Sequence, residues 1–477
     1  MGSPTLAAFS LALTAINAHW ADDRFSAINY PNHKNAVKAL IYLQQAPLHL
    51  TTHDCLLASL VVLPQNDHWW ECLVDRLEQT HNWTISAATP IAWVIIAFVF
   101  TIIDSSTNLG SLTSYSGGVG SIWLWLVAIV VGWLWIPFSS HDKLKSAIDK
   151  AKDLAFVAAD DPSTDDVGDP PNADGPRNIY PPRRAYDVSG IQAIRMSEKA
   201  EVFTRDATRA APVFNYARFW EWWCTVEMIA RAFERADGNA KDHAPVDRDK
   251  EWVLPEDRHT VIHSDNRTGT ARQVQEYCGF PVQGGEEPTR ALPSGVWKRV
   301  FIASVFALGL QWGATGSAAM IMILTPTTGL GCRSGAFVLY GVVSTMIWLT
   351  LLLSSYLAHF AQTRCNYGIP RSRFNSVAVA KGLATFLRRL STLAASCNAI
   401  WIVMACVFQF SEFYSTCYCN SSVIGRGTQR AYITITAAGD VYHNTKAKLI
   451  GSFVFNGGWI ILFLSFLHLM LHETNSS

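Results

Sequence analysis

The 477-residue chain carries no net charge, because its 38 lysine and arginine residues balance its 38 aspartate and glutamate residues. It therefore lacks the positive field that gathers nucleic acid or anionic substrates, and no nucleic-acid partner is expected. Cysteine is also scarce, since ten scattered residues are too few for a disulfide scaffold. Cys397 and Cys406 lie within apolar segments, where a thiol usually acts as a small hydrophobic group.

The sequence also lacks the short motifs that mark common catalytic and cofactor sites. It contains no HExxH zinc motif, no phosphate-binding P-loop and no pair of CxxC motifs. The stretch GCRSG at 331–335 misses the GxSxG nucleophile elbow, because Ser334 comes one place too late. We therefore expect no cofactor, no metal centre and no active site of a soluble type, and a role other than catalysis is favoured.

Apolar residues gather in uncharged blocks long enough to cross a lipid bilayer. The mean hydropathy of +0.14 conceals these blocks, because long polar stretches dilute the average. Tryptophan and tyrosine cluster at the block ends, as expected at the boundary between hydrocarbon and headgroups. We predict an all-α membrane protein with about six transmembrane helices in a bundle and a large, partly disordered polar loop. The predicted spans are Thr89–Ile103, Ser121–Phe138, Val300–Leu324, Gly335–Phe360, Ala394–Phe410 and Leu449–Leu471.

The spans divide the chain into successive regions. These are an N-terminal polar and mixed region (1–88), a first transmembrane hairpin (89–138), a large hydrophilic loop (139–297), a second hairpin (298–360), a basic loop (361–393), the last two helices (394–471) and a tail (472–477). Within the first region, Ser3–Trp20 is uncharged and moderately apolar, and no basic residue precedes it. This pattern argues against a cleaved signal peptide but leaves open a seventh span.

The distribution of basic residues predicts the orientation. Lysines between 143 and 152 follow the second span, Lys298 and Arg299 precede the third, and arginines and lysines fill 361–393. Such clusters favour the cytosolic side, so both termini and 139–297 are expected in the cytosol. Loops 104–120 and 326–334 hold one basic residue between them, as expected for the opposite side, whereas four basic residues in 411–448 weaken the contrast. We expect the plasma membrane or a membrane of the secretory pathway.

The large loop combines two kinds of segment. Residues 160–184 are acidic and rich in proline, and with nothing to bury they predict a disordered tether. Residues 215–236 instead predict an amphipathic helix that ends before Gly238. Its apolar stripe comprises Phe219, Trp222 or Trp223, Val226, Ile229 or Ala230, and Phe233. The stripe either lies on the cytosolic membrane face or packs against the rest of the loop, and the loop is expected to bind a cytosolic protein partner.

The predicted span cores contain no aspartate, glutamate, lysine or arginine, which argues against proton coupling and intramembrane hydrolysis. Small residues four positions apart, Gly309, Gly313 and Ser317, predict close helix packing. Gln311, Thr315 and Asn456 either hydrogen-bond between helices or contact a polar substrate. An ion-independent facilitator of small, weakly polar molecules is therefore the alternative function, and a membrane-embedded enzyme is the third.

The same topology assigns roles to cysteines and glycosylation sequons. Cys332 falls on the predicted lumenal or extracellular side together with Cys417 and Cys419, so a disulfide from Cys332 to one of them would join the two hairpins. The stretch CYC at 417–419 is only a weak metal motif without a flanking histidine. Four Asn-x-Ser/Thr sequons occur, at Asn82, Asn266, Asn420 and Asn475. Only Asn420 lies on the side where glycan is added, and glycan on Asn266 would reverse the orientation.

Three segments carry a resemblance to a known group of proteins. They are QWGATGSAAMIMILTPTTGLGCRSGAFVLYGVVSTMIWLTLLLSSYLAH (311–359), NYARFWEWWCTVEMIARAF (215–233) and CYCNSSVIGRGTQRAY (417–432). They resemble filamentous-fungal multi-pass integral membrane proteins of unknown function, and the likeness covers the C-terminal half well and residues 1–88 poorly. The resemblance implies topology, with no catalytic residue to carry over. Because some members of such groups lie beside secondary-metabolite genes, it also implies a role accessory to a biosynthetic gene cluster.

Overall fold

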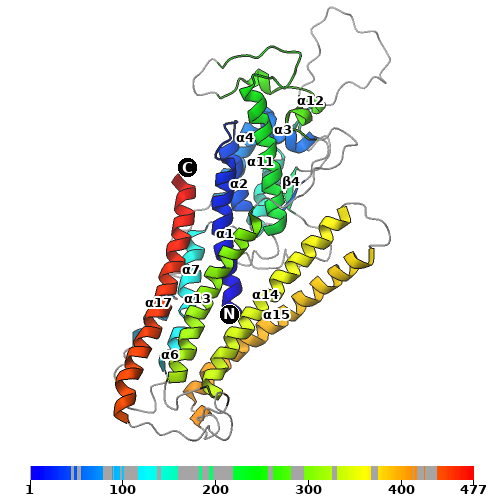
Figure 1. Cartoon of the computed structure of the whole chain (residues 1–477). Coiled ribbons are helices and arrows are strands. Elements are labelled where there is room, and N and C mark those ends of the chain that lie inside the picture. Colours follow the sequence, from blue (N-terminus) through cyan, green and yellow to red (C-terminus); the bar gives the residue numbers. More distant parts are fainter. Residues whose placement is uncertain are drawn as a thin grey trace, which may run out of the picture. The chain divides into compact units, whose positions relative to one another are not determined.

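The computed structural model of the chain is mostly helical and confirms the predicted all-α class, with two short antiparallel ribbons added (Figure 1). It describes residues 2–44, 48–50, 55–78, 89, 91–96, 99–100, 116–136, 141–159, 182–184, 193–196, 219–255, 261–280, 295–324, 330–366, 374–411, 413–415, 424 and 438–476. The chain forms two compact units. Unit 1 comprises Met1–Ile16, His81–Ile136 and Trp297–Ser477, and unit 2 comprises Asn17–Thr80 and Pro137–Val296.

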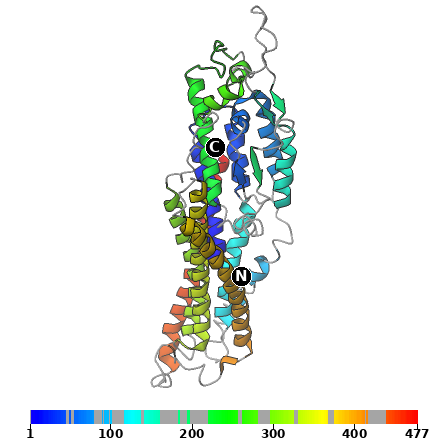
Figure 2. The same ribbon diagram turned by 90° about the vertical axis from the view of Figure 1, so that its right-hand side faces the viewer.

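Unit 1 contains the long apolar helices. Its elements are the first part of α1 (Pro4–Phe25), α6 (Ser116–Ile122), α7 (Trp125–Trp135), α13 (Val296–Leu324), α14 (Cys332–Asn366), α15 (Phe374–Phe410), the 3-10 turn η6 (Phe413–Ser415) and α17 (Ala438–Ser476). Helices α13, α17 and α7 run side by side, and α14 lies along α15 as a hairpin (Figures 1 and 2). The stacked rings of Phe306 and Phe466, with centroids 3.8 Å apart, join α13 to α17.

Four helices of unit 1 are long and apolar enough to cross a membrane, as far as the described residues reach. Their apolar stretches are Val296–Leu324, Cys332–Ala361, Val377–Gln409 and Ile450–His472. At about 1.5 Å per residue, even the shortest spans more than the roughly 30 Å of a hydrocarbon core. Each coincides with one of the last four predicted spans, which it contains to within one residue.

The outward side chains of these helices support the same conclusion. Only 17% of the apolar stretch of α17 is buried inside the molecule. Large apolar side chains that remain exposed on the four helices include Phe301, Met346, Ile400, Val454 and Ile461. An apolar surface of this kind is costly in water and stable in lipid. The four helices therefore support the prediction that the chain is a membrane protein.

The first two predicted spans are not confirmed as crossing helices. Most of Thr89–Ile103 lies outside the described residues. Ser121–Phe138 is divided, because α6 ends at Ile122 and α7 begins at Trp125, and the combined apolar stretch Val119–Trp135 is shorter than the four spans. Helix α7 nevertheless packs closely, since a Cβ atom added at Gly132 would lie 2.6 Å from Leu467 of α17.

Part of the region expected as a basic loop, 361–393, is helical. Helix α14 continues to Asn366, and α15 begins at Phe374. Two polar contacts hold the extended hairpin together: the Ser354 hydroxyl donates to the Ala384 carbonyl (2.7 Å), and the Thr350 and Ser391 hydroxyls lie 2.6 Å apart. With 37 residues, α15 is about 55 Å long, so its basic first half extends beyond a hydrocarbon core.

Unit 2 combines residues from the N-terminal region with the large loop. Its elements are the end of α1, α2 (His33–Leu43), β1 (Leu48–Leu50), α3 (Leu56–Val62), the turn η2 (Pro64–Asn66), α4 (Asp67–Leu77), α8 (His141–Lys152), β2 (Phe156–Val157), β3 (Arg183–Arg184), β4 (Ile194–Met196), α11 (Phe219–Lys241), the turn η4 (Ser264–Arg267) and α12 (Ala271–Tyr277). Strand β1 pairs antiparallel with β4, and β2 with β3. The predicted tether falls largely outside the described residues, because 160–181 are not described.

The amphipathic helix predicted at 215–236 is α11, and its apolar stripe forms the centre of the unit 2 core. Phe219, Trp222, Trp223 and Phe233 are completely buried. The indole nitrogen of Trp222 donates to the Leu40 carbonyl, and that of Trp223 to the Asn17 side chain, both at 2.8 Å. Figure 2 shows α11 (green) beside the blue N-terminal helices. The stripe was expected either to lie on the membrane face or to pack against the rest of the loop. These contacts are those of packing within unit 2.

An ion pair between a buried arginine and a partly exposed aspartate joins two further elements of unit 2. The guanidinium of Arg267, only 4% exposed, donates two hydrogen bonds to the Asp67 carboxylate at 2.8 and 2.6 Å and a third to the Val62 carbonyl at 2.9 Å. Burial would lower the pKa of Arg267, but the hydrogen bonds and charge of Asp67 more than offset it, so the net pKa is raised. Arg267 thus stays charged and ties η4 to the start of α4.

Replacing Arg267 should destabilise unit 2 strongly. Arg267→Met removes two hydrogen bonds from the Asp67 carboxylate, which is 39% exposed and keeps the Asn32 donor, and one from the buried Val62 carbonyl, at a cost of about 2–3 kcal/mol. At a slope of about 3 kcal/mol per molar urea, the unfolding midpoint should fall by about 1 M, measured by pulse proteolysis of the full chain. Arg272→Met is the control, because Arg272 forms an exposed pair with Glu276 worth less than about 1 kcal/mol. Equal midpoints for the two variants would contradict the assigned role of the ion pair.

Candidate functional site

Two places in the described structure could carry function: a polar cluster between the helices of unit 1 and a pocket in unit 2. The polar cluster consists of Ser3 and Thr5 at the start of α1, Gln311 and Thr315 on α13, and Ser344 on α14, and all five are buried. The Gln311 amide donates to the Thr315 hydroxyl (2.9 Å), and the Ser344 hydroxyl lies 3.4 Å from the Gln311 oxygen. The Ser3 hydroxyl donates to the Ser344 carbonyl at 3.0 Å.

A neighbouring asparagine, which the sequence did not single out, extends the cluster to α15. The Asn398 amide donates to the carbonyls of Gly2 (2.8 Å) and Tyr340 (3.3 Å). The Ser3 hydroxyl also accepts from the Leu6 N–H at 3.3 Å and thus caps the first turn of α1. The segment that could have been a seventh span therefore begins among the spanning helices, although it is not among the four helices that could cross a membrane.

These contacts are hydrogen bonds within α13 and between α13, α14 and the start of α1. Gln311 and Thr315 bond to each other, and Ser344 links them to the start of α1. Asn456 makes a similar link, because its amide donates to the Ser121 carbonyl of α6 at 3.1 Å. In lipid such bonds satisfy groups that have no water to contact. Substrate contact by Gln311, Thr315 or Asn456 stays a prediction.

The small-residue stripe of α13 lies against one tryptophan of α17. A Cβ atom added at Gly309 would lie 2.1 Å from Cζ3 of Trp459, and one added at Gly313 would lie 2.8 Å from its Cβ. Ser317 continues the stripe and is buried. The glycines therefore allow a close approach that no larger residue permits, as their spacing predicted.

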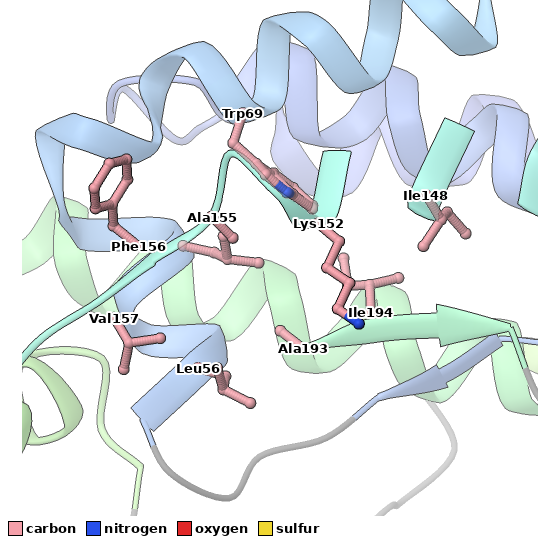
Figure 3. Close-up of a pocket in the computed structure, with 10 residues that line it drawn as sticks. Leu56, Trp69, Ile148, Lys152, Ala155, Phe156, Val157, Ala193 and Ile194 are labelled. Carbon is pink, nitrogen blue, oxygen red and sulfur yellow. The ribbon is translucent and has the colours of Figure 1, made fainter. Parts of the chain in front are cut away.

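The pocket in unit 2 was not predicted from the sequence. It is small, with a cavity volume of about 20 Å³, and it is partly open to solvent. Figure 3 shows the lining, which comes from α3, α4, α8, β2 and β4: Leu56, Leu60, Trp69, Ile148, Lys152, Ala155, Phe156, Val157, Ala193 and Ile194. Lys152 is the only ionisable residue among them. Its side chain extends from the end of α8 toward Ile194 (Figure 3).

The wall of this pocket is fixed by hydrogen bonds from the core. The Asn66 side chain accepts from the Phe156 N–H (2.8 Å) and donates to the Phe156 carbonyl (3.0 Å), which pins β2. The Ser59 hydroxyl accepts from the Ala158 N–H at 3.1 Å. The indole of Trp70, beside Trp69, donates to the Leu60 carbonyl at 2.8 Å. The pocket is therefore shaped before any ligand arrives.

The remaining titratable groups of the unit 2 core are structural. Burial raises the pKa of the Cys278 thiol and of the Tyr277 hydroxyl well above their usual ranges. Cys278 therefore stays protonated and acts as a small hydrophobic group rather than a nucleophile. No group of three or more histidine, cysteine, aspartate or glutamate residues able to hold a metal ion occurs within the part of the chain that the structure describes.

The structure gives one of the predicted sequons a different role. Asn266 is 1% exposed, and its side chain accepts from the Val253 N–H (2.9 Å) and donates to the Val253 carbonyl (2.7 Å). Its amide is thus committed to the fold. Asn475 lies in α17 and Cys332 begins α14, whereas Asn82, Asn420, Cys417 and Cys419 lie outside the described ranges. The predicted disulfide and the glycan on Asn420 stay predictions.

Comparison with known proteins found no matching family model, no matching curated protein and no matching solved structure.

Filling the α13–α17 contact should destabilise unit 1. Gly309→Ala forces the Trp459 ring away and should cost about 1–3 kcal/mol, seen as a fall of several degrees in the unfolding temperature of the purified protein in detergent. Gly451→Ala on α17 is the matched control, because nothing lies within 4 Å of an added Cβ there. Combining Gly309→Ala with Trp459→Leu should cost less than the sum of the single changes. Additive costs would show that the two residues do not meet.

Proposed function

We propose that this chain is a non-enzymatic multi-pass membrane protein whose unit 1 serves as the anchor and whose unit 2 binds a protein partner. The observation that carries the proposal is a set of exposed apolar side chains on unit 2. Within the described part of this unit, the exposed large apolar side chains are those of Val253, Leu254 and Val261, and Leu254 is 70% exposed. We call these three residues the apolar surface.

The apolar surface rests on a rigid support. Asn266 bonds to both backbone groups of Val253, and its own carbonyl accepts from the Val246 N–H at 3.0 Å. The ring of His243 lies 5.5 Å from that of Trp252 on the same segment. A fixed backbone that keeps aliphatic side chains in water is typical of a recognition surface, because little conformational entropy is lost when a partner covers it.

The finer topology is also part of the proposal. Six spans, with both termini and unit 2 in the cytosol, agree with the basic residues beside the predicted spans. The partner would then be a cytosolic protein, and the membrane would be the plasma membrane or one of the secretory pathway. The resemblance to filamentous-fungal proteins supports testing in such a host, including a role accessory to a secondary-metabolite gene cluster.

Transport by facilitation receives less support from the geometry. Gln311 and Thr315 bond to each other, and Asn456 bonds to Ser121. A substrate would have to replace these bonds, at a cost that its own hydrogen bonds must offset.

A charge placed on the apolar surface should weaken partner binding. Leu254→Asp should lower capture of the partner by roughly tenfold, because a buried carboxylate without a partner opposes association. A photo-crosslinking residue at position 254 should form a specific adduct with the partner in the host membrane. Mass spectrometry of the adduct then identifies the crosslinked protein. Glu251→Gln, on the same exposed segment, is the matched control and should leave capture unchanged. Point variants are preferable to deleting 160–297, which would remove α11 from the core of unit 2.

Equal capture by Leu254→Asp and the control would contradict the proposal. A crosslinked protein that Leu254→Asp still captures would do the same.

The orientation can be tested with a new sequon on an exposed part of unit 2. Arg248→Asn combined with Lys250→Thr creates one where the Arg248 side chain is 81% exposed, unlike the buried native sequon at Asn266. With unit 2 in the cytosol, glycosidase treatment should shift only forms modified at Asn420. A shift that depends on the new sequon would place unit 2 on the lumenal side and exclude a cytosolic partner.

A further inference from the structure

The break between α6 and α7 in unit 1 is held by a polar side chain of α17. Helix α6 ends at Ile122 and α7 begins at Trp125. In a regular α-helix the Ser121 carbonyl would accept from the Trp125 N–H, but here it accepts from the Leu124 N–H at 3.3 Å. The same carbonyl also accepts from the Asn456 amide at 3.1 Å. Asn456 therefore stabilises a backbone group within the broken helix.

Three buried polar atoms around this break have no hydrogen-bond partner among the described residues. They are Oδ1 of Asn456, the hydroxyl of Ser317 on α13 and the indole nitrogen of Trp125. Their residues are 0%, 2% and 3% exposed, respectively. A buried polar atom without a partner is destabilising, and most such atoms in proteins bond to protein groups or to ordered water. One acceptor, one hydroxyl and one donor, from three helices, point to a small neutral ligand.

The register of α13 and α17 brings two of these atoms together. The two helices run in opposite directions (Figure 1). A Cβ atom added at Gly313 of α13 would lie 2.8 Å from the Cβ atom of Trp459 on α17. Ser317 comes one turn after Gly313, and Asn456 comes about one turn before Trp459. Because the helices are antiparallel, both steps lead to the same level of the bundle.

The membrane depth of the two residues agrees with this register. Ser317 is about 10 Å from the end of its apolar stretch at Leu324, and Asn456 is about 9 Å from the start of its own at Ile450. Space adjoins Asn456, because Gly457 is half-buried and a Cβ atom added there would have no atom within 4 Å.

Trp125 faces α17 from α7. It lies two turns before Gly132, where an added Cβ atom would be 2.6 Å from Leu467, so this face of α7 packs on α17. Long side chains in a helix lean toward the preceding turn. The indole of Trp125 is therefore directed toward Ser121 and the Asn456 amide bound to it.

We propose that this junction of α6, α7, α13 and α17 binds one water molecule, which accepts from the Trp125 indole and donates to Asn456 Oδ1 and to the Ser317 hydroxyl. Three partners are typical of a buried water, and ordered water is one of the means by which broken helices are satisfied within membranes. A metal cation is not favoured, because it would need more oxygen ligands, and the Ser121 carbonyl already accepts two hydrogen bonds.

The water gives Asn456 a double role. Its amide nitrogen holds the break at Ser121, while its oxygen joins α17 to α13 through the water. The site belongs to unit 1 and needs no partner bound to unit 2.

A bound water changes the sign expected for Ser317→Ala. Without a ligand, this change removes an unpaired buried hydroxyl, so the unfolding temperature should stay the same or rise. With the water in place, it removes one of the bonds that hold the water. The unfolding temperature of the full chain in detergent should then fall by roughly 2–4 °C.

A double-mutant cycle tests whether the same water joins Ser317 to Asn456. Asn456→Leu removes the acceptor, so adding Ser317→Ala should lower the unfolding temperature by less than the sum of the single changes. Ser304→Ala is the matched control on α13, because the Ser304 hydroxyl donates to the Val300 carbonyl of its own helix at 2.6 Å. Its effect should add to that of Asn456→Leu. Where Asn456→Leu does not fold, Trp125→Phe takes its place, since it keeps an aromatic ring and removes the indole donor.

A crystal structure of the full chain grown in lipid shows the site directly. One density peak should lie within roughly 2.7–3.2 Å of both Asn456 Oδ1 and the Ser317 hydroxyl. An unchanged or higher unfolding temperature for Ser317→Ala would overturn the proposal, as would additive effects in the cycle or a map in which protein atoms fill the site. Partner capture is measured separately with Leu254→Asp, so the two proposals fail independently.

Discussion

A polar group that leaves water must find its hydrogen-bond partner inside the protein, because neither lipid nor an apolar core supplies one. Both units are organised by this constraint. In the spanning helices, Thr345 and Thr392 donate to carbonyls one turn earlier, and Gln311 bonds to Thr315. In the unit 2 core, the buried indoles and Arg267 reach backbone carbonyls or a carboxylate. Buried polar residues therefore mark the places where elements far apart in the sequence meet.

The four helices long and apolar enough to cross a membrane were predictable because their signal is local: a long run of apolar residues has no stable place in water. The helix over 374–393 was not predicted, although Val379, Leu383, Phe386 and Leu390 recur at helical spacing and are exposed. The basic residues between them indicated a loop, because the positive-inside rule weighs charge and is indifferent to secondary structure. The helical spacing of these apolar residues would have predicted the first half of α15. The second predicted span has the same composition but is divided between α6 and α7, a break that its continuous apolar run did not indicate.

The candidate sites were harder to predict, because their contacts join distant parts of the chain. The stripe of α11 follows from a period of 3.6, but nothing in it shows that Trp223 bonds to Asn17 or that Trp222 bonds to Leu40. Gln311 and Thr315 were identified as polar residues in an apolar run, whereas Asn398 was not, and its partner is a backbone carbonyl near the other end of the chain. The pocket had no sequence signal, since its lining is ordinary core residues and one lysine taken from five elements.

Two asparagines show how unit 2 creates surfaces that the spanning helices lack. Asn66 uses its side-chain oxygen and nitrogen to bond both backbone groups of Phe156, and Asn266 does the same to Val253. Each amide thus fixes a short extended segment by its backbone, and Phe156 also pairs with Arg184 of β3. The first segment becomes a pocket wall, and the second carries the exposed Val253 and Leu254. In unit 1, by contrast, Asn398 and Asn456 use their amide nitrogens to bond helix to helix. The same residue type therefore joins helices in unit 1 and fixes loop segments in unit 2, where we propose that a partner binds.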